Sequence, residues 1–286
     1  MAERYPKLRD DCFRYFKDRR YHKGVETFKI SSWEEFQIVI TIFEGYKDYI
    51  WRGQKQEDWQ LKSQIDRDYY VDRLVALFGK REDILKVLLE KSKEQLRSLE
   101  PPLCNVDSLE EYEIWTYAQH YGLLTHLLDW TKDPYIATYF ALYEEVTNEQ
   151  NNRVVYALNK AIKRLILKGK NAKKEIVSVK RFVDFLDSEK NQVHQLKNLR
   201  LEKQKGLFTK ALEKIDIEST VWNYAEKRYS DIVENNKILL AKFLIPNKLY
   251  CEFLTNLEYK NIIHMELFPD YEGVVKVCKI DLDLYT

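Results

Sequence analysis

The 286-residue chain has few of the residues that interrupt regular structure, with only 8 Gly and 6 Pro. Together these make up about 5% of the sequence, whereas average usage is roughly 12%. This scarcity favours long helices over a β-sandwich with many turns. The chain also lacks a charge excess, because 47 Lys and Arg face 46 Asp and Glu, and 45% of its residues are hydrophobic. This balance excludes a disordered or wholly cationic chain.

Cysteines are few and scattered, and none of the four belongs to a C-x-x-C pair. This spacing predicts reduced thiols rather than a disulfide framework or a metal site. No stretch approaches the roughly 18–20 consecutive apolar residues of a membrane helix, and the charged N-terminus lacks the apolar core of a signal peptide. We therefore expect a cytoplasmic protein with no membrane contact and no metal ion.

The hydrophobic pattern predicts an α+β fold: a small mixed sheet of about five strands with about eight flanking helices. Strands are expected at Val25–Ile30, 49–53, Arg153–Leu158, 238–245 and 274–280. Helices are expected from Ser32 to Glu44, over 71–99, from Asp107 to Gly122, from Pro134, over 218–234 and after Pro246. We assign residues 25–286 to a single domain, preceded by a helical extension at 1–24.

A capping box predicts where the helix expected from Ser32 to Glu44 begins. Here the hydroxyl of Ser32 should accept from the amide of Glu35, and the Glu35 carboxylate should reach back to Ser32.

A basic segment lies within this domain at residues 151–214, where 17 Lys and Arg accompany 6 Asp and Glu. Such a block can neutralise phosphates and give salt-sensitive binding to nucleic acid. A solvated helix face has the same composition, so both interpretations stay open. The candidate nucleic-acid contacts are Lys160, Lys163, Arg164, Lys168, Lys170, Lys173 and Lys174.

Two segments have an unusual density of polar residues. The first is the strand ending Trp51-Arg52-Gly53-Gln54, and the second runs from Gln119 to Thr131, where one helix ends and a loop precedes the next. So many Gln, His, Thr, Asp and Trp side chains cannot all be buried unless they are paired. The pattern therefore predicts a polar cleft.

These segments resemble the FRG domain family, whose pattern joins an F-R-G-Q strand end to a Q-H-Y-G-L-P-T-R-L-L-D-W-T loop and later motifs. The matching residues are Arg52-Gly53-Gln54, Trp59, Leu61, Ser63, Arg67, Gln119 to Thr131, Arg200, Gln204 to Phe208, Leu267 to Asp270, and Gly273. The resemblance spans about residues 25–280. Trp51 replaces the family's Phe, Lys62 and Leu124 replace prolines, and His126 replaces an arginine, although a neutral imidazole cannot hold an anion as a guanidinium does.

The resemblance implies a setting but no mechanism. The family has no agreed biochemical activity and is found among accessory or toxin-like domains of bacteria and their mobile elements. A bacterial toxin or phage-defence role is therefore the expected context.

The residue types in the two segments suggest how a nucleotide could be held. Arg52 can clamp a phosphate, and His120 can act as a base. Tyr121 can stack on a nucleobase or a nicotinamide ring, and Glu266 can steer a ribose. The further candidate ligand contacts are Gln54, Arg67, Gln119, Thr125, Asp129, Trp130, Arg200 and Gln204.

Each of these residues also has a structural interpretation. Arg52 and Asp129 could form an ion pair that ties a strand to a loop, and His120 could sit at a helix C-terminus because the dipole favours it there. Tyr121 and Trp130 could be core residues. These alternatives stay open.

Three function hypotheses follow. The first is a nucleotide-handling enzyme of ADP-ribosyltransferase type, with NAD as the candidate cofactor. The second is a non-catalytic module that binds nucleic acid or a nucleotide signal, and the third is a protein–protein scaffold of a mobile-element system. If the two polar segments form one site, the Arg52 guanidinium must contact the 119–131 segment, most directly through Asp129, with Gln54 and His120 facing the same cleft.

Overall fold

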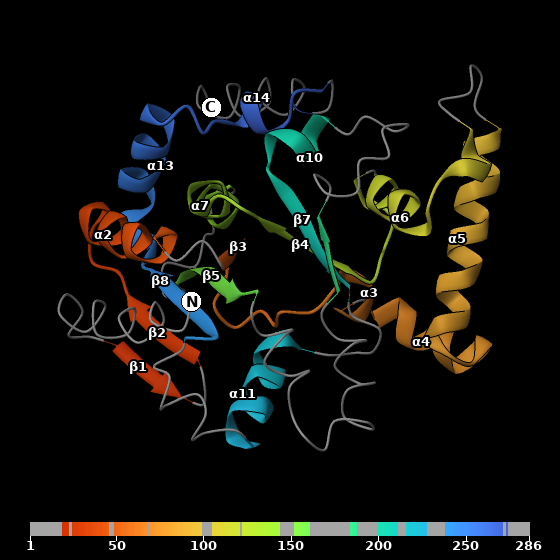
Figure 1. Ribbon diagram of the computed structural model, residues 1–286, viewed down its shortest axis with the longest axis horizontal. Coiled ribbons are helices and arrows are strands. Elements are labelled where there is room, and N and C mark those ends of the chain that lie inside the picture. The colour runs from red at the N-terminus through yellow and green to blue at the C-terminus, as the bar shows by residue number, and fades with distance from the viewer. Residues whose placement is uncertain are drawn as a thin grey trace, which may run out of the picture.

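The computed structural model describes residues 19–22, 25–45, 49–67, 69–98, 105–120, 122–143, 152–160, 184–187, 199–210, 216–227, 238–270 and 273. Within these residues, eight strands form one mixed sheet in the order β1-β2-β8-β5-β3-β4-β7-β6 (Figure 1). The α+β class is confirmed, and the sheet is larger than the expected five strands.

The strands are short, and most neighbours run antiparallel. They are β1 (Arg19–His22), β2 (Val25–Lys29), β3 (Tyr49–Gln54), β4 (Leu127–Thr131), β5 (Arg153–Asn159), β6 (Asp184–Asp187), β7 (Gly206–Lys210) and β8 (Leu240–Ile245). Among these neighbours, β2 and β8 pair in parallel. Strand β1 lies inside the segment expected to be a helical extension, and it pairs with β2.

Helices flank the sheet on both faces and at one end. They are α2 (Trp33–Glu44), α3 (Gln64–Arg67), α4 (Tyr69–Phe78), α5 (Arg81–Arg97), α6 (Glu111–His120), α7 (Pro134–Leu142), α10 (Leu199–Lys203), α11 (Ile217–Lys227), α13 (Tyr250–Tyr259) and α14 (His264–Leu267). Two 3-10 turns, η1 (Val106–Ser108) and η2 (Asn247–Leu249), complete the described elements. No described helix combines the length and the apolar character that crossing a membrane requires.

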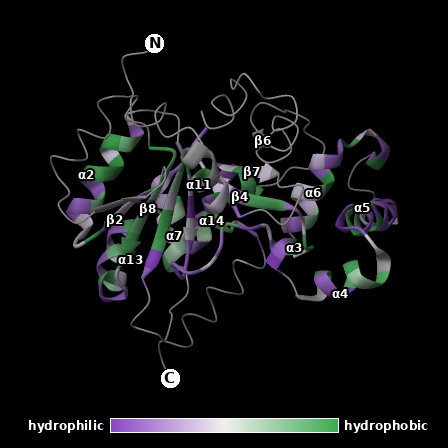
Figure 2. Ribbon diagram, turned by 90° about the horizontal axis from the view of Figure 1, so that it is seen from below, coloured by the Kyte–Doolittle hydropathy of each residue, from purple (hydrophilic) through white to green (hydrophobic). Residues whose placement is uncertain are grey.

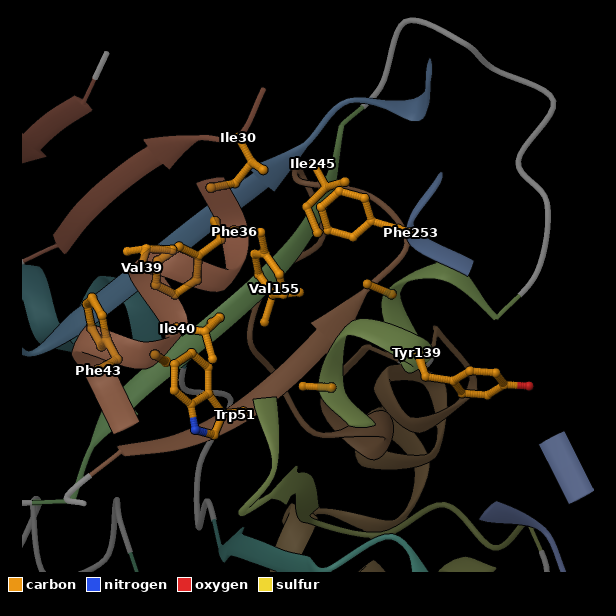
Figure 3. Packing of buried hydrophobic residues seen from close by; sticks show 14 of the residues in the cluster. Ile30, Phe36, Val39, Ile40, Phe43, Trp51, Tyr139, Val155, Ile245 and Phe253 are labelled. Carbon is orange, nitrogen blue, oxygen red and sulfur yellow. The ribbon is translucent and has the colours of Figure 1, made fainter. Parts of the chain in front are cut away.

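The main core lies between the sheet and helices α2, α7 and α13. Aromatic rings dominate it, with Phe28 stacked on Phe243 at 5.2 Å and Trp51 at 5.9 Å from Phe243. Figure 3 shows Trp51 among the aliphatic and aromatic side chains of this core. Helix α11 covers the opposite face with Ile217 and Val221.

A third hydrophobic cluster packs the four helices α3, α4, α5 and α6 against strands β4 and β7. Ile65, Trp115, Leu127 and Phe208 meet there. Figures 1 and 2 both show α4, α5 and α6 grouped at the side of the molecule away from α2 and α13. This group holds the segment that carries Arg67 against the sheet.

Helix α2 begins as the sequence predicts, with one difference in its capping box. The hydroxyl of Ser32 accepts from the amide of Glu35 at 3.2 Å. The Glu35 carboxylate, however, accepts from the amide of Ser31 at 2.6 Å rather than from Ser32. The reciprocal contact is therefore shifted by one residue.

The helix expected over 71–99 is divided into α4 and α5. Gly79 adopts φ 98° between them, a conformation that glycine reaches without the steric cost of a side chain. The periodicity continues across the break because both helices turn apolar residues toward the same cluster.

One expectation about the polar segments is wrong, and one differs by a residue. Strand β3 reaches Gln54, one residue beyond the expected range of 49–53, because Gln54 pairs with Val154 of β5. Residues 127–131 are a strand rather than part of a loop, because β7 supplies a partner for them. The expected strand at 274–280 lies outside the described residues, and the helix expected over 218–234 is described from Ile217 to Lys227.

Candidate functional site

The candidate site lies where two central strands separate. Strand β3 pairs with β5 over six residues, but its pairing with β4 is confined to Trp51 opposite Thr131. Beyond that point, Arg52 crosses the gap, and its Nη1 donates to the carbonyl oxygen of Asp129 at 2.7 Å. A side-chain hydrogen bond thus stands where a ladder bond would otherwise join the strands.

A cavity of about 400 Å³ opens beside this gap. That volume falls in the usual range for small-molecule sites. Its lining includes eight of the candidate residues, namely Arg52, Gln54, Arg67, Gln119, Asp129, Trp130, Arg200 and Gln204. The cavity therefore unites residues from both polar segments and from the later part of the chain.

The polar wall is organised around Asp129. Nε2 of Gln119 donates to its Oδ1 at 2.5 Å, and Nη1 of Arg52 lies 3.8 Å from its Oδ2. The hydroxyl of the buried Thr125 donates to Oε1 of Gln119 and so fixes which end of the amide faces the carboxylate. The amide of Leu127 donates to the Thr125 oxygen at 3.2 Å, which anchors the chain of contacts to β4.

Arg52 is also held from its own strand. Its Nε donates to Oε1 of Gln54 at 3.3 Å, and Nε2 of Gln54 donates to the carbonyl of Trp59 at 2.8 Å. The expected contact between Arg52 and Asp129 is therefore present, with the shorter bond made to the backbone. Gln54 faces the same cavity, as expected.

Burial shifts the charges on this wall. It lowers the pKa of Arg52 to about 10, against the opposing effect of Asp129. Burial also raises the pKa of Asp129, although Arg52, Gln119 and Arg67 act in the opposite direction. The Asp129 side chain keeps 59% of its surface accessible, because it faces the open cavity while protein atoms surround it. A carboxylate so placed can accept a proton or a hydrogen bond from a ligand.

The opposite wall is aromatic. Phe140 and Tyr143 come from α7 and its C-terminal end, and Phe268 follows α14. The Tyr143 and Phe268 rings stack at 5.6 Å, and His264 stacks on Phe268 at 4.5 Å behind them. These rings give the cavity a planar apolar surface.

Arg200 and Gln204 join the aromatic wall to the sheet. Arg200 binds both carboxylate oxygens of Asp270, one at 2.6 Å, and lies 5.2 Å from the Phe268 ring centroid. Nε2 of Gln204 donates to the carbonyl of Leu267 at 3.0 Å. Both residues thus hold the segment that carries Phe268.

The family comparison covers the polar wall. The FRG domain model matches residues 47–153. This segment is similar to the FRG domain family. No curated protein and no solved structure matches the chain.

The walls of the cavity differ in their relation to the FRG domain. Arg52, Gln119 and Asp129 lie within the match, as do Phe140 and Tyr143. The remaining lining residues lie beyond it, although the sequence resemblance was expected to reach about residue 280. They are Arg200, Leu201, Gln204, Gly206, Leu207, Phe208 and Phe268.

Several predicted site residues are placed elsewhere. Glu266 is not among the lining residues, and it pairs with Lys203 at 3.0 Å. Trp130 lines the cavity but is only 3% exposed and donates to the hydroxyl of Thr209, so it is largely a core residue. His126, which replaces the family's arginine, is buried edge-on against the ring of Trp115 at 5.1 Å.

Other predicted residues cannot be placed. His120 is the last residue of α6, and Tyr121 lies outside the described residues. Lys160 ends the segment that contains β5, and the other six candidate nucleic-acid contacts lie outside the described residues.

The sequence analysis missed the aromatic wall. Phe140 and Tyr143 are three residues apart, so the sequence places both on one helix face. Phe268 lies in the Leu267 to Asp270 part of the family pattern, which suggests no ligand by itself. Trp59, also in that pattern, is 39% exposed where it lines the cavity.

Proposed function

We propose that the cavity binds a nucleotide and that the protein is a nucleotide-handling enzyme of ADP-ribosyltransferase type with NAD as its substrate. The observation that carries this proposal is the pairing of an arginine-rich polar wall with an aromatic wall in one cavity of about 400 Å³. Arginine suits phosphate because its planar fork donates two parallel hydrogen bonds. Aromatic rings suit a nucleobase or a nicotinamide ring.

The cations exceed the carboxylates on the lining. Arg52, Arg67 and Arg200 are present, together with Lys55, and Asp129 is the one carboxylate among the described residues that line the cavity. Such a surplus favours an anionic ligand because a phosphate would offset the positive charge. Asp270, which pairs with Arg200, reduces the surplus only on the aromatic side.

ADP-ribosyl transfer breaks the bond between C1′ of the ribose and the nicotinamide nitrogen. The electron pair leaves with nicotinamide, and an acceptor adds at C1′. A carboxylate beside the ribose stabilises the positive charge that develops at C1′. Asp129 is the candidate for this role, since Glu266 pairs with Lys203 instead of lining the cavity.

The test is to incubate the purified protein with NAD and to measure nicotinamide release by chromatography, with and without nucleic acid or cell lysate as acceptor. We expect release by the native protein, loss on Asp129→Ala, and little change on Glu266→Ala. No release under any condition would reject the enzymatic proposal. Loss on Glu266→Ala alone would reject Asp129 as the carboxylate.

A non-catalytic nucleotide-binding module is the second candidate. It is favoured by the engagement of Asp129 with Gln119 and Arg52, which stabilises the lining without any ligand. Binding of NAD or ADP without turnover would support it. For nucleic acid, a gel-shift series in rising salt tests Lys160 and the other basic residues up to Lys174, because phosphate contacts weaken steeply with salt.

The cellular setting is a separate part of the proposal. The match to the FRG family, which is found among toxin-like domains of bacteria, supports a role in a bacterial toxin or phage-defence system. A mobile-element scaffold with a protein partner is the alternative. Expressing the native and Asp129→Ala proteins in bacteria, with and without phage challenge, tests this. Equal growth and equal phage yield in all cultures would argue against a toxin or defence role.

A further inference from the structure

We propose that Arg67 anchors the ligand phosphate, whereas Arg52 acts mainly as a structural bridge between β3 and β4. This inference rests on the proposed nucleotide site and assigns its phosphate position. It moves the expected phosphate clamp from the arginine of the family-naming motif to the one on α3.

Two of the three lining arginines are already engaged. Arg52 donates to the Asp129 carbonyl and to Gln54, and its side chain is 14% exposed. Arg200 binds Asp270 through two N–H groups. Each of these guanidiniums would have to give up protein contacts before it could hold a phosphate in full.

Arg67 is placed differently. It lines the same cavity and is exposed, and no hydrogen bond or ion pair joins it to any described residue. Burial lowers its pKa, while the charge of Asp129 raises it. The charges of Arg52 and Arg67 also oppose one another, so an anion between them would relieve that repulsion.

The acid next to Arg67 in the sequence is engaged elsewhere. Asp66, its neighbour on α3, is fully buried and binds Arg81 of α5 through Nε at 2.6 Å and Nη2 at 2.8 Å. The hydroxyl of Ser63 donates to the same carboxylate. Asp66 is thereby committed to holding α3 in place and leaves Arg67 for the cavity.

The backbone of α3 is fixed to the polar wall as well. The amide of Ile65 donates to the carbonyl of Thr125 at 3.3 Å, and the Ile65 side chain is fully buried. Thr125 also orients Gln119 and hence Asp129. The backbone that carries Arg67 therefore has a defined position relative to the Asp129 carboxylate, which a ligand-anchoring residue requires.

The test compares the binding of ADP and adenosine by calorimetry, because the two ligands differ only in the diphosphate. We expect Arg67→Ala to weaken ADP binding by at least about tenfold and to leave adenosine binding unchanged, since a charged hydrogen bond is lost. Arg67→Lys should recover part of the loss, because it keeps the charge but not the planar fork. Arg73→Ala, which removes an exposed arginine of α4 outside the lining, is the matched control.

The outcomes separate the two proposals. If the native protein binds ADP and Arg67→Ala binds it equally well, the phosphate assignment is wrong and the nucleotide site stands. If the native protein binds neither ADP nor adenosine, both proposals fail. Thermal melting of each variant checks folding, and Arg67→Ala should melt within a few degrees of the native protein because its side chain makes no bond to the described residues.

Discussion

The two edges of β3 differ in how they are closed, and the difference locates the site. Toward β5, six consecutive residues from Tyr49 to Gln54 are paired, and the strand is continuous with the core. Toward β4, a single pair is followed by a side-chain bridge from Arg52. The cavity lies beside the edge where the ladder stops, and helices complete its lining.

Two arginine–aspartate pairs, one behind the cavity lining and one within it, differ in how far they are exposed. Arg81 and Asp66 have side chains that are 7% and 0% exposed, which suits a structural ion pair. Arg52 and Asp129 are 14% and 59% exposed, so one partner is buried and the other faces the cavity. The Asp129 carboxylate therefore remains accessible to a ligand in the cavity, whereas Asp66 does not.

The face of β3 that packs against α7 should be the most sensitive to substitution. A Cβ at Gly53 would lie 1.9 Å from the carbonyl oxygen of Ala137 and 2.5 Å from the amide nitrogen of Ala141, both backbone atoms of α7. We expect Gly53→Val to lower the free energy of unfolding by more than about 3 kcal/mol, because α7 must move away from the sheet. Urea denaturation measures the loss.

The control for this substitution is Gly45→Ala at the end of α2. There a Cβ would come no closer than 3.3 Å to the carbonyl of Ile42, and we expect a change below about 1 kcal/mol. Equal losses at Gly53 and Gly45 would mean that the packing of α7 on β3 is not tight.

The bridge on the open side should have a smaller effect. We expect Arg52→Met to destabilise the protein by about 1–3 kcal/mol, because the carbonyl oxygen of Asp129 and the side-chain oxygen of Gln54 each lose a donor in a largely buried place. Arg67→Met removes a guanidinium from the same cavity without breaking a bond to a described residue, and it should cost less than about 0.5 kcal/mol. Similar losses for both variants, measured by urea denaturation, would contradict the bridging role of Arg52.

The sequence predicted those parts of the fold that depend on local chemistry. The start of α2 follows from Ser32, and the start of α7 follows from Asp133, whose carboxylate accepts from the amides of Tyr135 and Ile136 ahead of the helix interior. The meeting of Arg52 with Asp129 followed from the need of a buried guanidinium for an acceptor. Each of these inferences needs only neighbouring residues or one strong physical requirement.

The remaining features depend on partners that are distant in the chain. Residues 127–131 form a strand because β7 pairs with them, and the residues next to Asp129 in the sequence do not predict that pairing. Phe268 reaches the cavity because Gln204 and Arg200 hold its segment. Glu266 lies outside the cavity lining for the same reason, since the position of α14 relative to the cavity is set by tertiary contacts.

The contacts that hold Gln119 beside Asp129 can be tested by substituting Thr125. Thr125→Val keeps the shape of this fully buried side chain but removes the donor to Gln119 and the acceptor for Leu127. We expect a loss of about 1–2 kcal/mol, since buried polar groups are left without partners. Thr41→Val, at an exposed hydroxyl on α2, is the control and should change the unfolding free energy by less than about 0.5 kcal/mol. A neutral Thr125→Val variant would mean that Gln119 does not depend on this contact.

The smallest expected effect, and the one with a distinctive pH dependence, is at Asp129. Its pKa is raised in the folded protein, chiefly by burial, so the charged form is less favourable there than in the unfolded chain. The protonated form therefore contributes stability that is fully present below the ordinary pKa of the carboxyl group and is lost as the pH rises through the raised value.

Asp129→Asn resembles the protonated form at every pH, because its amide oxygen can still accept from Gln119 and its backbone carbonyl can still accept from Arg52. At neutral pH we expect this variant to be slightly more stable than the native protein, by less than about 1 kcal/mol, because the side chain is largely accessible to solvent and its charge is screened. The difference should shrink as the pH falls through the raised pKa toward the ordinary one. Unfolding free energies of both proteins across this range provide the measurement. A less stable Asp129→Asn at neutral pH would show that the attraction of Arg52 outweighs burial, and the open side of β3 would then be held by charge as well as by the bridge to the carbonyl.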